Sequence, residues 1–143
     1  MITLETVKGG KMPVYQTRGS SGADVYARAG TAIPSMGTVI VPVGVKISSW
    51  NTRGNLVPEL QMRLRSSLAI KEGLIIPNGF GTIDADYSDE IGIILFNPQK
   101  HAYFVEKGQR VGQLVQVWTQ RIHGVEILEE ERTGGYGSTG RRH

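Results

Sequence analysis

The densest group of potentially reactive side chains in this sequence is acidic. Residues 84–90 carry four carboxylates, those of Asp84, Asp86, Asp89 and Glu90. At a β-hairpin such a group suits a hard cation or a general base, and a solvated turn is the alternative. If the segment is extended, Asp84 and Asp86 share one face while Ala85 points away. An EF-hand is excluded, because Leu95 stands where that loop requires its bidentate Glu.

Two other segments carry groups that could bind phosphate. Arg65-Ser66-Ser67 lies between a predicted strand and a predicted helix, so a guanidinium, two hydroxyls and backbone N–H groups could converge on phosphate oxygens. The glycine-rich segment 134–140 could gather its N–H groups around an anion, and a disordered terminus is the alternative. Segment 134–140 also approaches two nucleotide-binding motifs, G-x-G-x-x-G and the P-loop, but it lacks the following helix that both require.

Two further polar residues lie at the start of predicted strands. Asp24 follows Ser21-Gly22-Ala23, and Gln113 ends the segment 108–113. Taken alone, Asp24 is a common turn former and Gln113 an ordinary exposed strand residue. The three histidines show no metal-ligand spacing, and the absence of cysteine excludes thiol nucleophiles, cysteine-based zinc sites and disulfides.

The elements that must position these residues are short strands. Nineteen glycines and six prolines separate runs rich in Val, Ile and Thr, which predicts one all-β domain with a sandwich, jelly-roll or small-barrel architecture. The predicted strands are 2–7, 23–26, 38–42, 44–47, 56–64, 74–77, 81–83, 91–96, 102–105 and 110–118. The only predicted helix spans Ser66 to Glu72, with Ser66 or Ser67 as its cap and Gly73 as its end.

Charge and hydropathy narrow the class of protein. A net charge of +3 favours an anionic ligand, and no basic stripe with interleaved aromatics indicates stable nucleic-acid binding. No apolar run approaches the ~18 residues of a membrane span, and no signal peptide opens the chain. We therefore expect a soluble, cytoplasmic protein that does not bind membranes.

Five segments in order resemble the five motifs of the trimeric dUTPases, and the resemblance covers the whole chain. They are residues 21–25 (Ser-Gly-Ala-Asp-Val), 65–69 (Arg-Ser-Ser-Leu-Ala), 81–87 (Gly-Thr-Ile-Asp-Ala-Asp-Tyr), 108–113 (Gly-Gln-Arg-Val-Gly-Gln) and 134–140. The resemblance implies a jelly-roll-like β-clip fold and a homotrimer whose three active sites are shared between subunits. It also implies Mg²⁺-dependent hydrolysis of dUTP to dUMP and pyrophosphate, which limits uracil incorporation into DNA and supplies dUMP for thymidylate synthesis.

The resemblance also assigns roles around the triphosphate. Asp84 would be the catalytic base that deprotonates the water attacking the α-phosphorus. Asp24 would hold Mg²⁺ through water. The triphosphate would be bound by Arg65, Ser66, Ser67 and Gln113.

Further roles concern the nucleoside and the end of the chain. Asn78 and the backbone of Gly81 and Ile83 would read uracil, and Tyr87 would lie under the deoxyribose and exclude a 2′-hydroxyl. Residues 1–131 would form the β domain and residues 132–143 a flexible arm that closes over the site. In this arm Tyr136 would stack on the base, and the γ-phosphate would be enclosed by Arg132, Gly137, Ser138 and Thr139.

The chain departs from the family pattern at three places. Leu64-Arg65-Ser66-Ser67 replaces Pro-Arg-Ser-Gly, Asp89 replaces a glycine, and only Thr133 separates Arg132 from the glycine pair. Arg132, Arg141 and Arg142 are therefore all candidates for the γ-phosphate contact.

Two alternative functions were weighed against this hypothesis. The first is a dCTP deaminase or a bifunctional nucleotide enzyme, but the deaminase glutamate would align with Ile94, which cannot transfer protons. The second is a phage regulatory protein that binds a repressor, and the stretch from Gln61 to Gly81 contains none of the long insertions common in such proteins.

Overall fold

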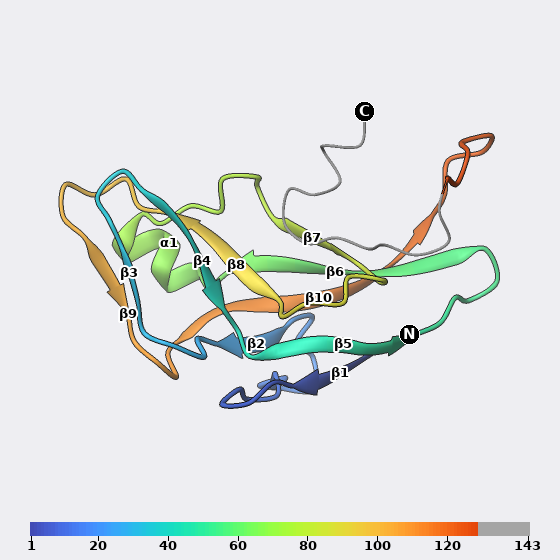
Figure 1. Cartoon of the computed structure of the whole chain (residues 1–143), viewed down its shortest axis with the longest axis horizontal. Coiled ribbons are helices and arrows are strands. Elements are labelled where there is room, and N and C mark those ends of the chain that lie inside the picture. The colour runs from blue at the N-terminus through green and yellow to red at the C-terminus, as the bar shows by residue number, and fades with distance from the viewer. Residues whose placement is uncertain (129–143) are drawn as a thin grey trace.

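The computed structural model describes residues 1–128, which form ten strands and one short helix (Figure 1). The elements are β1 (Ile2–Thr6), β2 (Ala23–Tyr26), β3 (Thr31–Ile33), β4 (Thr38–Pro42), β5 (Val45–Trp50), β6 (Leu56–Leu64), α1 (Ser66–Glu72), β7 (Gly81–Asp84), β8 (Gly92–Phe96), β9 (Tyr103–Val105) and β10 (Arg110–Gln120). The predicted all-β class is confirmed. The helix among residues 1–128 is too short to span a membrane.

The main sheet is antiparallel and has the strand order β2-β10-β6-β7. Its register places Ala23, Leu114, Met62 and Gly81 in one row across the four strands. The first three of these side chains are buried in the core. Because side chains alternate along a strand, the neighbouring residues in sequence point to the opposite face, which we call the outer face of the main sheet.

Three two-stranded sheets, β1-β5, β3-β9 and β4-β8, surround the main sheet. In Figure 1, β3, β4, β8, β9 and α1 gather at one end of the molecule, and β1 and β5 run along one side. The core between them is mostly aliphatic: Val41, Val43, Val45, Ile91, Ile93 and Leu95 are fully buried. Burial of such side chains is the main favourable contribution to folding.

Several sequence-based boundaries are confirmed. β2, β4, β6 and α1 have the predicted ends, and the other confirmed strands differ by one to three residues at an end. Helix α1 ends at Gly73, whose φ of 65° is in the left-handed region that glycine adopts without steric cost. Strand β3 was not predicted, since its three residues carry too short a pattern to recognise.

Other predictions are wrong. Residues 74–77 form no strand; Ile75 makes a single bridge to Phe96 of β8. Neither Ser66 nor Ser67 caps α1, because the N-cap residue is Arg65 and no side chain makes the capping hydrogen bond. Arg65 is held instead by its backbone N–H, which donates to the carbonyl oxygen of Val111 at 3.1 Å.

The β-hairpin predicted at the acidic segment is also wrong, and the turn before β7 forms no hairpin either. Before β7, the chain pairs through Ile75 with β8, whereas β7 itself pairs with β6. After β7, the acidic segment leads to β8, which pairs with β4. Each turn therefore crosses between different sheets, a difference that is invisible in sequence because turn residues look alike in both arrangements.

Candidate active site

The predicted phosphate-binding residues converge at one end of the main sheet. Asp24 on β2, Gln113 on β10 and Arg63 on β6 form one row on the outer face. Arg65-Ser66-Ser67 begins two residues beyond Arg63, where β6 passes into α1. The sheet thus brings together three motifs that are separated by as many as 89 positions in the chain.

Gly22 lets Gln113 approach the chain closely. A Cβ atom at position 22 would collide with the side-chain amide oxygen of Gln113 and lie 3.0 Å from its Cβ. Glycine at this position therefore follows from the packing of Gln113. The residue type at position 22 is therefore constrained by the position of the Gln113 side chain.

The carboxylate of Asp24 is paired within the chain. Nη1 of Arg110 donates to Oδ2 of Asp24 at 3.0 Å, and the Asp24 side chain is 16% exposed. A shift in register between Arg110 and Gly112 accompanies this pairing. Arg110 was missed as a site residue because its contact with Asp24 depends on that irregularity, which no sequence pattern reveals.

The predicted base lies at the other end of the same outer face. Asp84 is the last residue of β7, it lies opposite Glu59 of β6, and it is exposed. Ile83, Ala85 and Tyr87 are buried while Asp84 and Asp86 are not, but the chain turns at residues 85–86, so the extended arrangement on which a shared face was predicted is not present. An exposed carboxylate on this face is accessible to a water molecule and a substrate.

A ladder of polar side chains joins the two ends of the outer face. Arg63 Nη2 donates to Gln61 Oε1 at 2.9 Å, and Gln61 Nε2 donates to Glu59 Oε2 at 3.0 Å. This ladder was not predicted. The i, i+2 spacing of the three polar residues along β6 is the signal that would have found it.

The residues predicted to read uracil lie before and within β7. Asn78 is exposed in a turn in which the N–H of Gly79 donates to the carbonyl oxygen of Ile76 at 2.9 Å. Gly81 lies opposite Met62, and the side chain of Ile83 is in the core, 8% exposed. Ile83 can therefore face a base only through its backbone, as predicted.

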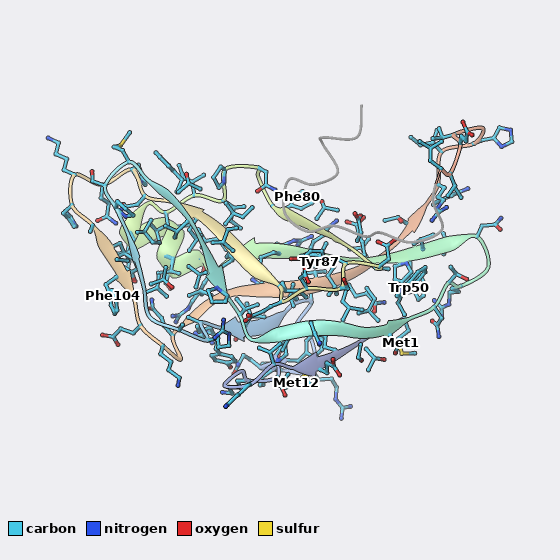
Figure 2. The ribbon with its side chains drawn as sticks, viewed as in Figure 1. Met1, Met12, Trp50, Phe80, Tyr87 and Phe104 are labelled. Carbon is cyan, nitrogen blue, oxygen red and sulfur yellow. The ribbon has the colours of Figure 1, made fainter. Side chains whose placement is uncertain are left out.

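Tyr87 lies near the centre of the molecule and is 5% exposed (Figure 2). Its hydroxyl donates to the carbonyl oxygen of Glu90 at 3.2 Å, and its N–H donates to the carbonyl oxygen of Asp84 at 3.0 Å. The ring lines a cleft of about 350 Å³ between β5 and residues 85–88. Little of Tyr87 is therefore open to a ligand.

The two halves of the site are far apart within one chain. Asp84 and Gln113 are separated by four residues along the strands and by two strand spacings across the sheet. At ~3.4 Å per residue and ~4.8 Å per strand, this separation is about 17 Å. A general base must be within about 3 Å of the water that it deprotonates. Asp84 and the predicted phosphate-binding residues of one chain therefore lie at opposite ends of the outer face.

Metal ligands are sparse in the described region. Residues 1–128 contain no group of three or more His, Asp or Glu side chains arranged to hold an ion. Asp24 offers one carboxylate near the phosphate-binding row. The predicted contacts of Arg132, Tyr136, Gly137, Ser138 and Thr139 lie outside the described residues, as does the predicted domain boundary at residue 131.

Comparison with known proteins agrees with this geometry. The dUTPase family model matches residues 8–140. The chain is 36% identical over 143 residues to the deoxyuridine 5'-triphosphate nucleotidohydrolase of Fusobacterium nucleatum, covering 94% of this chain and 92% of that protein.

Solved structures show the same fold. The crystal structure of the Streptococcus mutans dUTPase superposes with a TM-score of 0.74 at 28% identity, covering 85% of this chain and 98% of that one. A dUTPase mutant from phage phi11 of S. aureus, in which a structural Mg(II) ion is coordinated, has a TM-score of 0.72 at 19% identity and covers 92% of this chain and 99% of its own. The family match, the identity over nearly the full length and the shared fold together show that this chain belongs to the dUTPase family.

Proposed function

We propose that this chain hydrolyses dUTP to dUMP and pyrophosphate. The observation that carries this proposal is the outer face of the main sheet, which bears a phosphate-binding row at one end and an exposed carboxylate at the other. The family match supports it. In the cell this reaction would limit uracil incorporation into DNA and supply dUMP for thymidylate synthesis.

Asp84 is the general base in this proposal. Its carboxylate accepts a proton from a water molecule, which then attacks the α-phosphorus and displaces pyrophosphate. The backbone of Asp84 is held by β6 on one side and by the N–H of Tyr87 on the other. Such restraint keeps a base in position before the substrate arrives.

The triphosphate is bound by the opposite end of a neighbouring subunit's outer face. Arg65 supplies positive charge, Ser66 and Ser67 supply hydroxyl and backbone donors at the start of α1, and Gln113 supplies an amide. Hydrogen bonds between charged phosphate oxygens and these donors are the stronger kind. They fix the α-phosphorus for in-line attack.

The donor set fits Mg²⁺ that arrives with the nucleotide. Mg²⁺ keeps several waters and usually binds through one or two carboxylates plus substrate phosphates, and Asp24 provides one such carboxylate beside the phosphate-binding row. Bound Mg²⁺ would neutralise charge on the triphosphate oxygens. The guanidinium of Arg110 holds the Asp24 carboxylate in place through its hydrogen bond to Oδ2.

Selectivity for the nucleoside is assigned to the segments on either side of Asp84. Asn78 and the backbone of Gly81 and Ile83 read the pyrimidine, and Tyr87 closes the space beneath the deoxyribose. Residues 132–143 form an arm in which Tyr136 stacks on the base and Arg132, Gly137, Ser138 and Thr139 surround the γ-phosphate. The support for the arm is its glycine-rich sequence and its place in the family pattern.

The working enzyme in this proposal is a homotrimer. The support is the separation of about 17 Å between the backbones of Asp84 and Gln113 in one chain, which favours a site completed by a second chain. Closed cyclic symmetry then gives every subunit the same surroundings and produces three equivalent sites. The cytoplasmic location stays a prediction.

One assay separates this function from its rivals. Pyrophosphate release is measured with dUTP, dCTP, dTTP and UTP, each with and without Mg²⁺, beside the variant Asp84→Asn. We expect release from dUTP alone, dependence on Mg²⁺, and a loss of about 10²–10⁴-fold in turnover in the variant. Ammonia release from dCTP would instead support the deaminase alternative, which Ile94 disfavours.

A further inference from the structure

The side chain of Glu90 is held by three N–H groups from two other parts of the chain. Arg28 Nε donates to Glu90 Oε2 at 2.7 Å, and Arg28 Nη2 donates to Oε1 at 3.0 Å. The backbone N–H of Gly44 donates to Oε2 at 2.8 Å. We call this arrangement the Glu90 clamp. A planar guanidinium that grips a carboxylate with two bonds fixes direction as well as distance.

The clamp joins segments that the main sheet does not join. Arg28 follows β2, Gly44 lies between β4 and β5, and Glu90 lies between β7 and β8. Arg28 is itself fixed, because its backbone N–H donates to the carbonyl oxygen of Pro42 at 2.8 Å. Its hydrogen bond to Glu90, and then the charge of Glu90, raise the pKa of the Arg28 guanidinium above its ordinary value. The Arg28 guanidinium therefore stays charged over the working pH range of an enzyme.

A chain of hydrogen bonds leads from the clamp to the candidate base. The carbonyl oxygen of Glu90 accepts from the hydroxyl of Tyr87 at 3.2 Å, and the N–H of Tyr87 donates to the carbonyl oxygen of Asp84 at 3.0 Å. Both ends of Tyr87 are thus tied, the ring through its hydroxyl and the backbone through its N–H. The clamp acts on the side chain of Glu90 and the Tyr87 hydroxyl bonds its backbone, so the two are linked through the Glu90 main chain.

Between β7 and Ile91, which exchanges backbone hydrogen bonds with Val43 and Val45, this segment has little support from sheet pairing. β7 has four residues and lies at the edge of the main sheet, so only β6 pairs with it there. Residues 85–90 follow this edge strand as turn and irregular backbone. A partly exposed ion pair contributes little to overall stability, so the consequence of the clamp is expected in local geometry.

We propose that Glu90 is a positioning residue that holds Tyr87 against the sugar and thereby sets the discrimination between dUTP and UTP. The proposal rests on the proposed function, in which Tyr87 excludes the 2′-hydroxyl. The Tyr87 ring can exclude a 2′-hydroxyl by steric collision only if the ring cannot move aside. The Glu90 clamp prevents that movement. Glu90 itself touches neither substrate nor water in this account.

The test compares kcat/KM for UTP with kcat/KM for dUTP in four variants. Glu90→Gln weakens the clamp, Tyr87→Phe removes only the hydroxyl bond to Glu90, and the double variant removes both. The control is Glu5→Gln, which breaks the exposed ion pair between Glu5 and Lys46 on β1 and β5. We expect the UTP to dUTP ratio to rise about tenfold in each of the first two variants and to stay unchanged in the control.

The double variant gives a readout that a purely structural role would not move. If Glu90 acts through Tyr87, the double variant should relax sugar discrimination no further than the larger of the two single effects. Effects that multiply would overturn the proposal, and so would an unchanged ratio in Glu90→Gln with a lowered melting temperature. If Glu90→Gln does not fold, Arg28→Lys tests the same link by replacing the two-bond grip with a single charge.

A further variant separates this proposal from the proposed function. Tyr87→Ala removes the wall and should raise the UTP to dUTP ratio more than any change at Glu90. A response to Tyr87→Ala without a response to Glu90→Gln refutes only the positioning role. Absence of dUTP hydrolysis in the unmodified protein would refute the function itself.

Discussion

Mixed trimers provide a direct test of how the site is divided between chains. Asp84→Asn removes the base, and Ser67→Ala combined with Gln113→Ala removes two phosphate contacts at the far end of the outer face. The base loss costs about 10²–10⁴-fold in turnover. Two hydrogen bonds to charged oxygens at ~1.5–3 kcal/mol each imply a similar loss in kcat/KM for the phosphate variant. Each homotrimer should therefore be almost inactive.

The mixture should regain activity because the two defects lie in different halves of the site. Asp84 is about 17 Å from Gln113 in the same chain, and in the proposed trimer each site takes its base from one subunit and its phosphate row from a neighbour. In randomly assembled trimers from equal amounts of the two variants, the subunit that supplies the base has an intact Asp84 with probability one half. The neighbour that supplies the phosphate row is intact with the same probability. About one quarter of the sites, and of the unmodified activity, should be restored.

The assay is pyrophosphate release by trimers co-expressed with two different affinity tags and purified through both tags. Selection through both tags removes homotrimers, so the expected fraction of intact sites rises to about one third. Homotrimers mixed after purification, without subunit exchange, serve as the control. Activity in the mixed trimers no higher than in the controls would refute the divided site, because a site built within one chain can never be complete in either variant.

Four further perturbations follow from the same structure. Gly10→Ala should lower the free energy of unfolding by ~1–3 kcal/mol, because a Cβ atom there would collide with the backbone of Gly44. Gly19→Ala is the control and should be nearly neutral, because a Cβ atom there would have nothing within 4 Å. Denaturant unfolding at one protein concentration compares the two variants. Asp24→Asn should raise the Mg²⁺ concentration needed for half-maximal turnover, and an unchanged titration would remove Asp24 from the metal site. Chelation of Mg²⁺ should abolish turnover and leave the melting temperature unchanged, since no described residues form a resident metal cluster. Truncation after Glu131 should also leave the melting temperature unchanged, because the buried core among the described residues ends at Leu114, but it should lower kcat; unaltered kcat would contradict the role of the arm.

The elements were predictable where local patterns specify them. The bounds of β6 follow from nine residues of near-regular alternation between turn signals, and the end of α1 follows from the left-handed conformation that Gly73 adopts. The order and spacing of the motifs identified Asp84 and Gln113 as candidates without any structure. Alternation did not extend to Asp86, because β7 ends at Asp84 and the chain turns at residues 85–86.

The pairing of elements was not predictable, because it joins residues that are distant in sequence. The turns before and after β7 carry ordinary turn residues, yet each connects strands of different sheets. Arg110 reaches Asp24 across 86 positions through an irregular register, and Arg28 reaches Glu90 across 62. No periodicity in a single sequence encodes such contacts, since they arise only when the strands are assembled.

The two halves of the site differ in how they are held, and this difference matches their tasks. The phosphate row lies on β2, β10 and β6, which pair with one another and are anchored on their inner side by Ala23, Leu114 and Met62. Triphosphate is common to all nucleotide substrates, so a rigid site for it costs no selectivity. The nucleoside half lies on an edge strand and its turns, where sheet pairing alone would leave the sugar wall free to move. In the proposed mechanism, selectivity for deoxyribose therefore depends on restraint from outside the main sheet. The Glu90 clamp joins this segment to the residues after β2 and to the β4–β5 turn, and the backbone of Ile91 bonds to the same turn.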